Sequence, residues 1–190
     1  MLLENRIICP EGRETLIATN LGKVFKSKEP AVRDVSFTLD NNANKILGVV
    51  GPTGAGKSTL FKLLTMMEKR SQGSVELLGK RDFSWSGQQV GMLAQEDILW
   101  PELTVSENIE FIGRLKGLSR ETIRSHQDTL QEVLSLQQFA KTYAADLSGG
   151  NKRKLACAMA LIGKPQVVIL DEPATGLDPV SRKNLYRYLK

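Results

Sequence analysis

Histidine and cysteine are scarce in this sequence, and their scarcity excludes several kinds of functional site. The 190 residues contain one histidine, His126, and two cysteines, Cys9 and Cys157. A single histidine excludes a metal centre built from several histidines and most histidine-based catalysis within this chain. Two distant cysteines do not suggest a disulfide framework or a metal knuckle, so a reducing compartment is the simplest assumption. We expect His126 to be a solvent-exposed residue of a helix.

Long apolar runs are also missing. The sequence has no run of 18 apolar residues, so it predicts no membrane-spanning helix. Its N-terminus lacks the apolar core of a secretory signal. An apolar content of 41% and a charged content of 25% are typical of a soluble globular protein, and 190 residues are enough for one domain with a sizeable core.

Positive charge exceeds negative charge without forming a concentrated patch. The net charge of +5 and the isoelectric point of about 9.2 permit contact with nucleic acid or anionic lipid. The clusters of basic residues are Lys23, Lys26 and Lys28, and Lys152, Arg153 and Lys154. We interpret both clusters as solvent-exposed helix or loop faces and expect no nucleic-acid partner.

A glycine-rich stretch at residues 51–59 is the most informative feature of the sequence. It reads Gly-Pro-Thr-Gly-Ala-Gly-Lys-Ser-Thr and matches G-x-x-x-x-G-K-[ST], the pattern of a phosphate-binding loop. Glycines let backbone N–H groups surround a triphosphate without interference from Cβ atoms. We expect Lys57 to reach the β- and γ-phosphates and act in catalysis, and the Ser58 hydroxyl to bind Mg²⁺. The predicted nucleotide-binding residues are Gly51, Pro52, Thr53, Gly54, Ala55, Gly56, Lys57, Ser58 and Thr59.

The segments on either side of this loop fit its role. Residues 46–50 read as a buried strand, and apolar residues recur at helical spacing after the loop. The apolar residues of this predicted helix are Leu60, Phe61, Leu63, Leu64 and Met67. The sequence therefore predicts a strand, the loop and a helix in succession.

Two carboxylates follow a second buried strand. Residues 167–170 are apolar and β-branched or leucine, as in a central parallel strand, and Asp171 and Glu172 come directly after them. Open α/β sheets place ligands at the carboxyl ends of such strands. We expect Asp171 to hold the Mg²⁺ shell and Glu172 to polarise the attacking water as general base. The alternative is a strand that ends in surface carboxylates, but the phosphate-binding loop earlier in the chain favours the catalytic interpretation.

The remaining pattern predicts an α/β protein with a helical insert. Strands are expected near residues 16–18, 35–39, 75–78 and 90–93, with a polar turn at 21–30. Thr104 and Glu107 predict a capping box, and Ser119 a cap, for two helices of the insert. The residues expected on one side of the first helix are Val105, Ile109, Ile112 and Leu115, and those expected to face inward in the second are Ile123, Leu130, Val133 and Leu134. Further helices are expected after Gly150 and from Asp178.

Residues 147–151, Leu-Ser-Gly-Gly-Asn, add a second anion-binding motif. A serine and two glycines at the start of a helix present free N–H groups and the positive end of the helix dipole. The stretch resembles the LSGGQ signature of ATP-binding-cassette ATPases and departs from it only at Asn151. The resemblance implies that Ser148, Gly149 and Gly150 bind the γ-phosphate held by the opposite protomer of a head-to-tail dimer.

Three other positions resemble motifs of the same family in the same order. Gln95 resembles the Q-loop glutamine, which implies a Mg²⁺ ligand with a catalytic role and a sensor of the transmembrane partner. Residues 175–178 resemble the D-loop, which implies that Asp178 lies at the nucleotide. Phe25 resembles the aromatic residue that stacks on adenine, with a core phenylalanine as the alternative.

The resemblance implies the fold and its boundaries. We expect an α/β P-loop NTPase fold of the cassette type, with a mostly parallel sheet, antiparallel strands near the N-terminus and a helical subdomain at about 96–147. Residues 1–13 are expected to be a lead-in after a membrane domain, and 14–190 the nucleotide-binding domain. The family's switch histidine follows a later strand, whereas the sequence stops 18 residues after Glu172. A truncated domain or a fragment without its C-terminal strands is therefore expected.

The implied function is that of an ATP-binding and ATP-hydrolysing transporter domain at the cytoplasmic face of a membrane. Its partners would be a transmembrane domain and a second nucleotide-binding domain, with ATP and Mg²⁺ as cofactors. Residues 2–7, 95–111 and 147–173 resemble the second such domain of subfamily A transporters, which are associated with lipids. One alternative is a regulatory module with little hydrolysis. Another is a soluble cassette ATPase acting on nucleic acid or ribosomes, although the 91 residues between Lys57 and Ser148 suit transporters.

Overall fold

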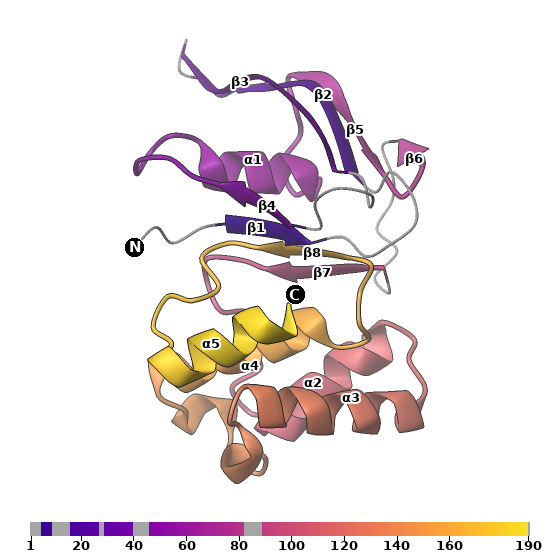
Figure 1. Cartoon of the computed structure of the whole chain (residues 1–190), viewed down its shortest axis with the longest axis vertical. Coiled ribbons are helices and arrows are strands. Elements are labelled where there is room, and N and C mark those ends of the chain that lie inside the picture. The colour runs from indigo at the N-terminus through magenta and orange to yellow at the C-terminus, as the bar shows by residue number, and fades with distance from the viewer. Residues whose placement is uncertain (1–4, 9–15, 27–28, 40–45, 82–88, 190) are drawn as a thin grey trace. The chain divides into compact units, whose positions relative to one another are not determined.

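The computed structural model describes residues 5–8, 16–26, 29–39, 46–81 and 89–189, which fall into two compact units (Figure 1). The first unit covers Met1–Trp85 and the second Ser86–Lys190, and each is described by itself. Most of the predicted lead-in, together with Cys9 and Lys28, lies outside the described residues.

An antiparallel sheet dominates the first unit. Its strands are β2 (Leu16–Val24), β3 (Pro30–Leu39), β5 (Gln72–Leu77) and β6 (Lys80–Arg81), in the order β3-β2-β5-β6 (Figure 1). Separately, β1 (Asn5–Ile8) pairs antiparallel with β4 (Ile46–Val49), the strand that leads into the glycine-rich loop. The prediction of antiparallel strands near the N-terminus is confirmed.

β2 is longer than the sequence predicts, and the predicted turn at 21–30 is wrong over residues 21–24. Leu21 is fully buried and pairs with Val35 of β3, while Gly22 pairs with Gln72 of β5. The register shifts between Ala18 and Leu21 on one side of β2 and between Thr19 and Gly22 on the other. Such bulges break the alternation of apolar and polar residues, so the second half of the strand does not show the period of two.

The helix after the glycine-rich loop is shorter than predicted. α1 (Lys57–Leu64) buries Leu60, Phe61, Leu63 and Leu64, as its apolar spacing indicates. It ends at Leu64, the Thr65 hydroxyl donates a hydrogen bond to the carbonyl of Phe61, and Met66 has a φ of 56°. Met67 therefore lies beyond the helix and is 56% exposed, so its prediction as an apolar residue of this helix is wrong.

The second unit joins a parallel strand pair to four α-helices. β7 (Val90–Leu93) pairs parallel with β8 (Val167–Leu170), whose residues are all buried. The helices are α2 (Val105–Leu115), α3 (Arg120–Val133), α4 (Gly149–Leu161) and α5 (Pro179–Tyr188), with short 3-10 turns at Gln137–Phe139 and Ala144–Asp146. No helix in the described part of the chain combines the length and apolar character needed to cross a membrane.

The inward face of α2 includes a polar residue that the apolar pattern does not reveal. Asn108 is fully buried, accepts a hydrogen bond from the Trp100 N–H, and donates to the carbonyls of Trp100, Leu103 and Thr104. A buried amide with this many partners fixes the segment before the helix. The buried stripe therefore runs through Asn108, and Leu115, predicted on the apolar side of this helix, is 66% exposed. Ile112, predicted on the same side of α2, and Val133, predicted to face inward in α3, are only half-buried.

His126 is not the solvent-exposed histidine that the sequence predicts. It lies on α3 but is half-buried, and its Nδ1 atom is buried without a hydrogen-bond partner among the described residues. Burial, followed by the nearby Lys164 charge, lowers the pKa of His126.

Replacing Thr104 with Ala should lower the free energy of unfolding by about 1 kcal/mol. The predicted capping box is present: the Thr104 hydroxyl accepts from the Glu107 N–H at 3.3 Å, and the Glu107 carboxylate accepts from the Thr104 N–H at 2.8 Å. Urea denaturation of the full chain measures the change. Thr129→Ala is the control, because this exposed threonine lies within α3 and caps no helix. Equal stability of the two variants would contradict the role of the cap.

Candidate functional site

The glycine-rich loop of the first unit has the backbone geometry of an anion-binding site. Gly54 and Gly56 have φ values of 82° and 88°, in the left-handed region that glycine adopts without steric cost. Gly56 is the N-cap of α1 and supplies no side-chain cap, so the first N–H groups of the helix remain available to a ligand. There is no acidic residue in the first turn of α1 to compete with an anion for these groups.

Lys57 lies folded over the start of its own loop. Its ammonium donates hydrogen bonds to the carbonyls of Gly51 at 2.8 Å and Pro52 at 2.9 Å. These bonds fix the ammonium at the loop that is predicted to surround the phosphates. Ser58 and Thr59, the other predicted ligands at the helix start, are half-buried. The structure thus brings all residues of the predicted loop together on one turn of chain.

A cavity of about 660 Å³ lies beside the loop within the first unit. It is lined by residues of β3 and β4 and by the end of the loop, among them Val35, Leu47, Val49, Ala55 and Gly56. Its cationic side chains are Arg33 and Lys57. An open, largely apolar hollow with a few cations next to a phosphate-binding loop suits an anionic ligand with an apolar part.

Phe25, predicted to stack on adenine, follows β2 and does not line this cavity. Phe25 is 46% exposed, which does not fit the alternative of a core phenylalanine. The ammonium of Lys23 lies 4.9 Å from the ring centroid, a cation–π contact, and also pairs with the Glu68 carboxylate at 2.6 Å. The Lys23 side chain is 12% exposed, so its interpretation as a solvated charge is wrong, while stacking by Phe25 stays a prediction.

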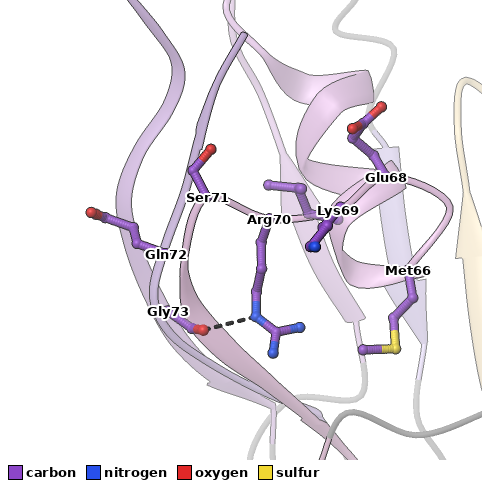
Figure 2. Close-up of a pocket in the computed structure, with 8 residues that line it drawn as sticks. Met66, Glu68, Lys69, Arg70, Ser71, Gln72 and Gly73 are labelled. Carbon is purple, nitrogen blue, oxygen red and sulfur yellow. Dashed lines mark hydrogen bonds between the residues drawn. The ribbon is translucent and has the colours of Figure 1, made fainter.

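A second cavity of the first unit, of about 390 Å³, lies at the other end of α1. Figure 2 shows its lining, in which the Arg70 Nε donates to the carbonyl of Gly73 at 2.8 Å. The remaining lining residues are Leu63, Met66, Glu68, Lys69, Ser71 and Gln72. None of the predicted nucleotide or metal residues belongs to this cavity, so the candidate site is the one at the loop.

In the second unit, the two parallel strands bring Gln95 and the carboxylates to the same edge. Leu93 is opposite Leu170 at the ends of β7 and β8, and the Asp171 N–H continues the ladder to the Leu93 carbonyl at 2.9 Å. Gln95 and Glu172 follow immediately beyond this bond. Gln95 is exposed and Asp171 is 7% exposed. The placement of these side chains at the carboxyl ends of parallel strands agrees with the position predicted from the sequence.

Glu172 has a strained backbone. Its φ is 50°, in the left-handed region that costs a residue with a Cβ about 1 kcal/mol or more. Its carboxylate accepts a hydrogen bond from the Thr175 hydroxyl at 3.2 Å, and the residue is half-buried. Strain at a carboxylate that is also a candidate general base is a feature of functional sites.

Arg153 and Lys154 are part of the site's support, and their interpretation as solvent-exposed charges is wrong. They are 5% and 8% exposed, because α4 is buried on every side from Arg153 to Leu161. The Arg153 guanidinium binds the segment after β7 and the segment after β8. The sequence contains one signal of this burial, a basic pair followed directly by a long apolar run rich in alanine. A helix of this composition leaves no solvent-exposed face for the two charges.

The predicted signature forms the start of α4. Ser148 is its N-cap, with the hydroxyl accepting from the Asn151 N–H at 3.3 Å, and both Ser148 and Gly149 are exposed. A Cβ on Gly150 would lie 2.8 Å from the carbonyl oxygen of Gly176, so the predicted D-loop packs directly on the signature. The structure therefore brings these two predicted motifs together.

Asp178 already uses both of its carboxylate oxygens. It is the N-cap of α5, accepts from the N–H and hydroxyl of Ser181, and pairs with the Lys154 ammonium at 2.8 Å. The hydrogen bond from Lys154, followed by those from Ser181, holds the pKa of the Asp178 carboxyl well below its usual range. Its predicted contact with a nucleotide stays a prediction, and the observed contacts tie α5 to the signature helix.

Cys157 has no features of a reactive thiol. It is fully buried in α4, its thiol lies 3.7 Å from the Pro173 carbonyl, and burial raises the thiol pKa to about 12. Nucleophilic cysteines have lowered pKa values and partial exposure. Cys157 is therefore a packing residue.

The predicted metal donors suit Mg²⁺. Ser58, Gln95 and Asp171 offer a hydroxyl, an amide carbonyl and a carboxylate, which are oxygen donors of the kind that Mg²⁺ prefers. In the part of the chain that the structure describes, no group of three His, Cys, Asp or Glu residues could hold a metal ion. Such a donor set fits an ion that is held partly by phosphates and water.

Comparison with known proteins places this chain among transporter components. The profile of the family described as ABC transporter matches residues 32–175, which is more than half of the chain. ABC transporter A family member 11 of Dictyostelium discoideum is 40% identical over 176 residues, covering 89% of this chain and 20% of that protein. The retinal-specific phospholipid-transporting ATPase ABCA4 of Homo sapiens is 39% identical over 175 residues, covering 90% of this chain and 8% of that protein. The chain thus spans a fifth or less of these two relatives.

A solved structure confirms the fold. The dimeric structure of the ATP-binding cassette MJ0796, in a post-hydrolysis state bound to ADP and Pi, matches with a TM-score of 0.75 at 24% identity. The match covers 92% of this chain and 81% of that chain. The α/β fold predicted from the sequence, with its phosphate-binding loop, antiparallel N-terminal strands and helical part, is that of an ATP-binding cassette.

Proposed function

We propose that this chain, which belongs to the ABC transporter family, is an ATPase domain. It would bind and hydrolyse ATP to drive a transporter. The relatives include members of subfamily A. The observation that carries the proposal is the glycine-rich loop, where left-handed Gly56 opens α1 without a side-chain cap and Lys57 lies over the loop. This arrangement offers backbone N–H groups and one ammonium to a polyphosphate.

Hydrolysis would use the carboxylates after β8. Asp171, with Ser58 and Gln95, is proposed to hold Mg²⁺, which neutralises charge on the β- and γ-phosphates when bound. Glu172 would accept a proton from the attacking water. Support comes from the position of Gln95, Asp171 and Glu172 at one edge of the parallel pair.

ATP would also join two such domains head to tail. The start of α4 is exposed at Ser148 and Gly149 and has no acidic residue in its first turn. It therefore offers N–H groups and a positive dipole end to an anion held by another chain. The dimeric state of the solved cassette MJ0796 supports the pairing of two such domains.

The transporter's cargo is proposed to be lipid. This chain is 39% identical to a domain of ABCA4, which is named as a phospholipid-transporting ATPase. The domain would act on the cytoplasmic face of a membrane, where a transmembrane partner receives the movement that accompanies ATP-driven pairing. Stimulation of ATP hydrolysis in the assembled transporter by phospholipid vesicles, compared with detergent alone, tests this part of the proposal.

Replacing Ser148 with Arg should weaken ATP-dependent pairing at least about tenfold, because a bulky cation would fill the exposed helix start that receives the partner's phosphate. ATP binding by the single chain should not change. Light scattering of the Glu172→Gln protein, with and without ATP, measures pairing, and a fluorescent ATP analogue measures binding.

Two matched variants separate the effect of a bulky cation at the start of α4 from the loss of the helix cap and from the added charge itself. Ser148→Ala removes the hydroxyl that accepts from Asn151 without adding bulk, so it reports the loss of the helix cap alone. Ser125→Arg adds the same side chain to an exposed serine of α3. Pairing of Ser148→Arg that equals pairing of Ser125→Arg would contradict the proposed role of the signature.

A further inference from the structure

We propose that Arg153 is a positioning residue that holds Glu172 and the Gln95 segment in the geometry required for hydrolysis. This inference rests on the proposed ATPase function and adds to it a residue outside the motifs recognised in the sequence. The side chain is 6% exposed, lies on α4, and reaches the ends of both parallel strands.

One nitrogen of the guanidinium holds the segment that leaves β7. Nη1 donates to the carbonyls of Ala94 at 2.8 Å and Gln95 at 3.3 Å, and it forms a 2.7 Å ion pair with Asp97. The Asp97 side chain is 24% exposed, and its carboxylate balances an otherwise buried positive charge. These contacts fix the backbone of Gln95 and leave its amide side chain exposed for a ligand.

The other terminal nitrogen holds the segment that leaves β8. Nη2 donates to the carbonyl of Asp171 and to that of Glu172 at 2.8 Å. Both contacts are to backbone oxygens, so the guanidinium holds this segment through its main chain and not through either carboxylate. The bond to the Glu172 carbonyl holds a residue whose φ of 50° is unfavourable for any side chain with a Cβ.

Arginine is required here by geometry. The hydrogen bond between the Asp171 N–H and the Leu93 carbonyl lies at the end of the parallel ladder, and the guanidinium bridges the two segments beyond it. Its donors lie in one plane with fixed spacing, whereas a lysine has a single ammonium on a flexible stem. A lysine at position 153 would therefore keep the charge and lose the bridge.

Replacing Arg153 with Met should lower kcat for ATP hydrolysis about 10- to 100-fold, because displacement of a catalytic group by about 1 Å is enough for such a loss. The KM for ATP and the affinity for a fluorescent ATP analogue should stay within about twofold, since Arg153 binds the backbone of residues 94, 95, 171 and 172 and the Asp97 carboxylate. The kcat of Arg153→Lys should fall between those of the wild type and Arg153→Met.

Asp97→Ala, which removes one partly exposed anchor and leaves the core intact, should lower kcat about threefold to tenfold. Arg124→Met, at an exposed position of α3, should behave as wild type.

Hydrogen–deuterium exchange of the same variants, in the assembled transporter, tests whether Arg153 bridges the two segments. It does not depend on a measurement of activity. Arg153→Met and Asp97→Ala should exchange faster at residues 94–97, and Arg153→Met also at 171–175, with no change over α3. Unchanged exchange would overturn the bridge. Faster exchange with wild-type kcat, or a loss of activity that follows a loss of ATP binding, would overturn the positioning role. A wild-type protein that hydrolyses no ATP, with no effect of Glu172→Gln, would instead overturn the proposed function, while the exchange data still decide whether Arg153 bridges the strands.

Discussion

Replacing Glu172 with Gln should lower kcat for ATP hydrolysis about 10²- to 10⁴-fold, the range by which a positioned general base accelerates proton transfer. Glutamine has nearly the same shape as glutamate and can still accept the hydrogen bond from Thr175, but it cannot take a proton from water. ATP binding should be retained. Release of inorganic phosphate measures turnover, and a fluorescent ATP analogue measures affinity.

The strained backbone at Glu172 makes this substitution a clean test. Because glutamine carries the same Cβ, it bears the same cost at a φ of 50°, and the Arg153 bond to the residue 172 carbonyl is unaffected. A lowered rate can therefore be assigned to the lost carboxylate. Glu132→Gln, at an exposed position of α3, controls for the change of charge. Equal phosphate release by the wild type and Glu172→Gln would remove Glu172 as the general base, and absent release in both would favour the regulatory alternative.

Short local patterns in the sequence were sufficient to predict the helices and strands that carry the motifs. The start of α1, the capping box of α2 and the Asp178 cap of α5 depend on a few adjacent residues, so their positions follow from short patterns. β8 is recognisable because four consecutive buried residues precede two carboxylates. At these helix starts, the residues that form the cap lie within a few positions of the first turn, whereas β8 is recognised from its composition alone.

The parts that were missed depend on contacts between distant segments. The second half of β2 is a strand because β3 and β5 pair with it on both sides, and its bulges hide the alternation. Arg153 is buried because its acceptors lie 56 to 59 residues earlier in the chain and 18 to 19 later. A run of lysine and arginine read without these partners is typical of a solvated face.

For the candidate site, the sequence identified the groups that meet a ligand better than the groups that hold them. Glycines, serine, glutamine and carboxylates at fixed spacing are chosen by the chemistry of phosphate and Mg²⁺, so the motif is visible in one sequence. Asp97 and Lys154 form ion pairs with Arg153 and Asp178, and many residue types could satisfy such a contact. Their roles became apparent once the acceptors were placed.

Replacing Gly56 with Ala should weaken ATP binding at least about 100-fold and lower the free energy of unfolding by about 2–4 kcal/mol. A Cβ at this position would lie 2.1 Å from the carbonyl oxygen of Ala31, a backbone atom of β3 that has no flexible side chain to move away. The φ of 88° adds the cost of a left-handed residue. Either the loop or β3 must shift, and the N–H groups at the start of α1 then no longer point together toward the proposed phosphate position.

The comparison with Gly79→Ala separates the close approach from the backbone conformation. Gly79 has a similar φ of 73°, but a Cβ added there would have no atom within 4 Å, and the residue belongs to the turn between β5 and β6. Its alanine variant should lose about 1 kcal/mol of stability and bind ATP as the wild type does. Thermal unfolding and titration with a fluorescent ATP analogue measure the two effects. If Gly56→Ala matched Gly79→Ala in both, the contact of the loop with β3 would have no part in forming the site. If Gly56→Ala lost affinity but not stability, the loop would have moved away from β3 at little cost in folding free energy.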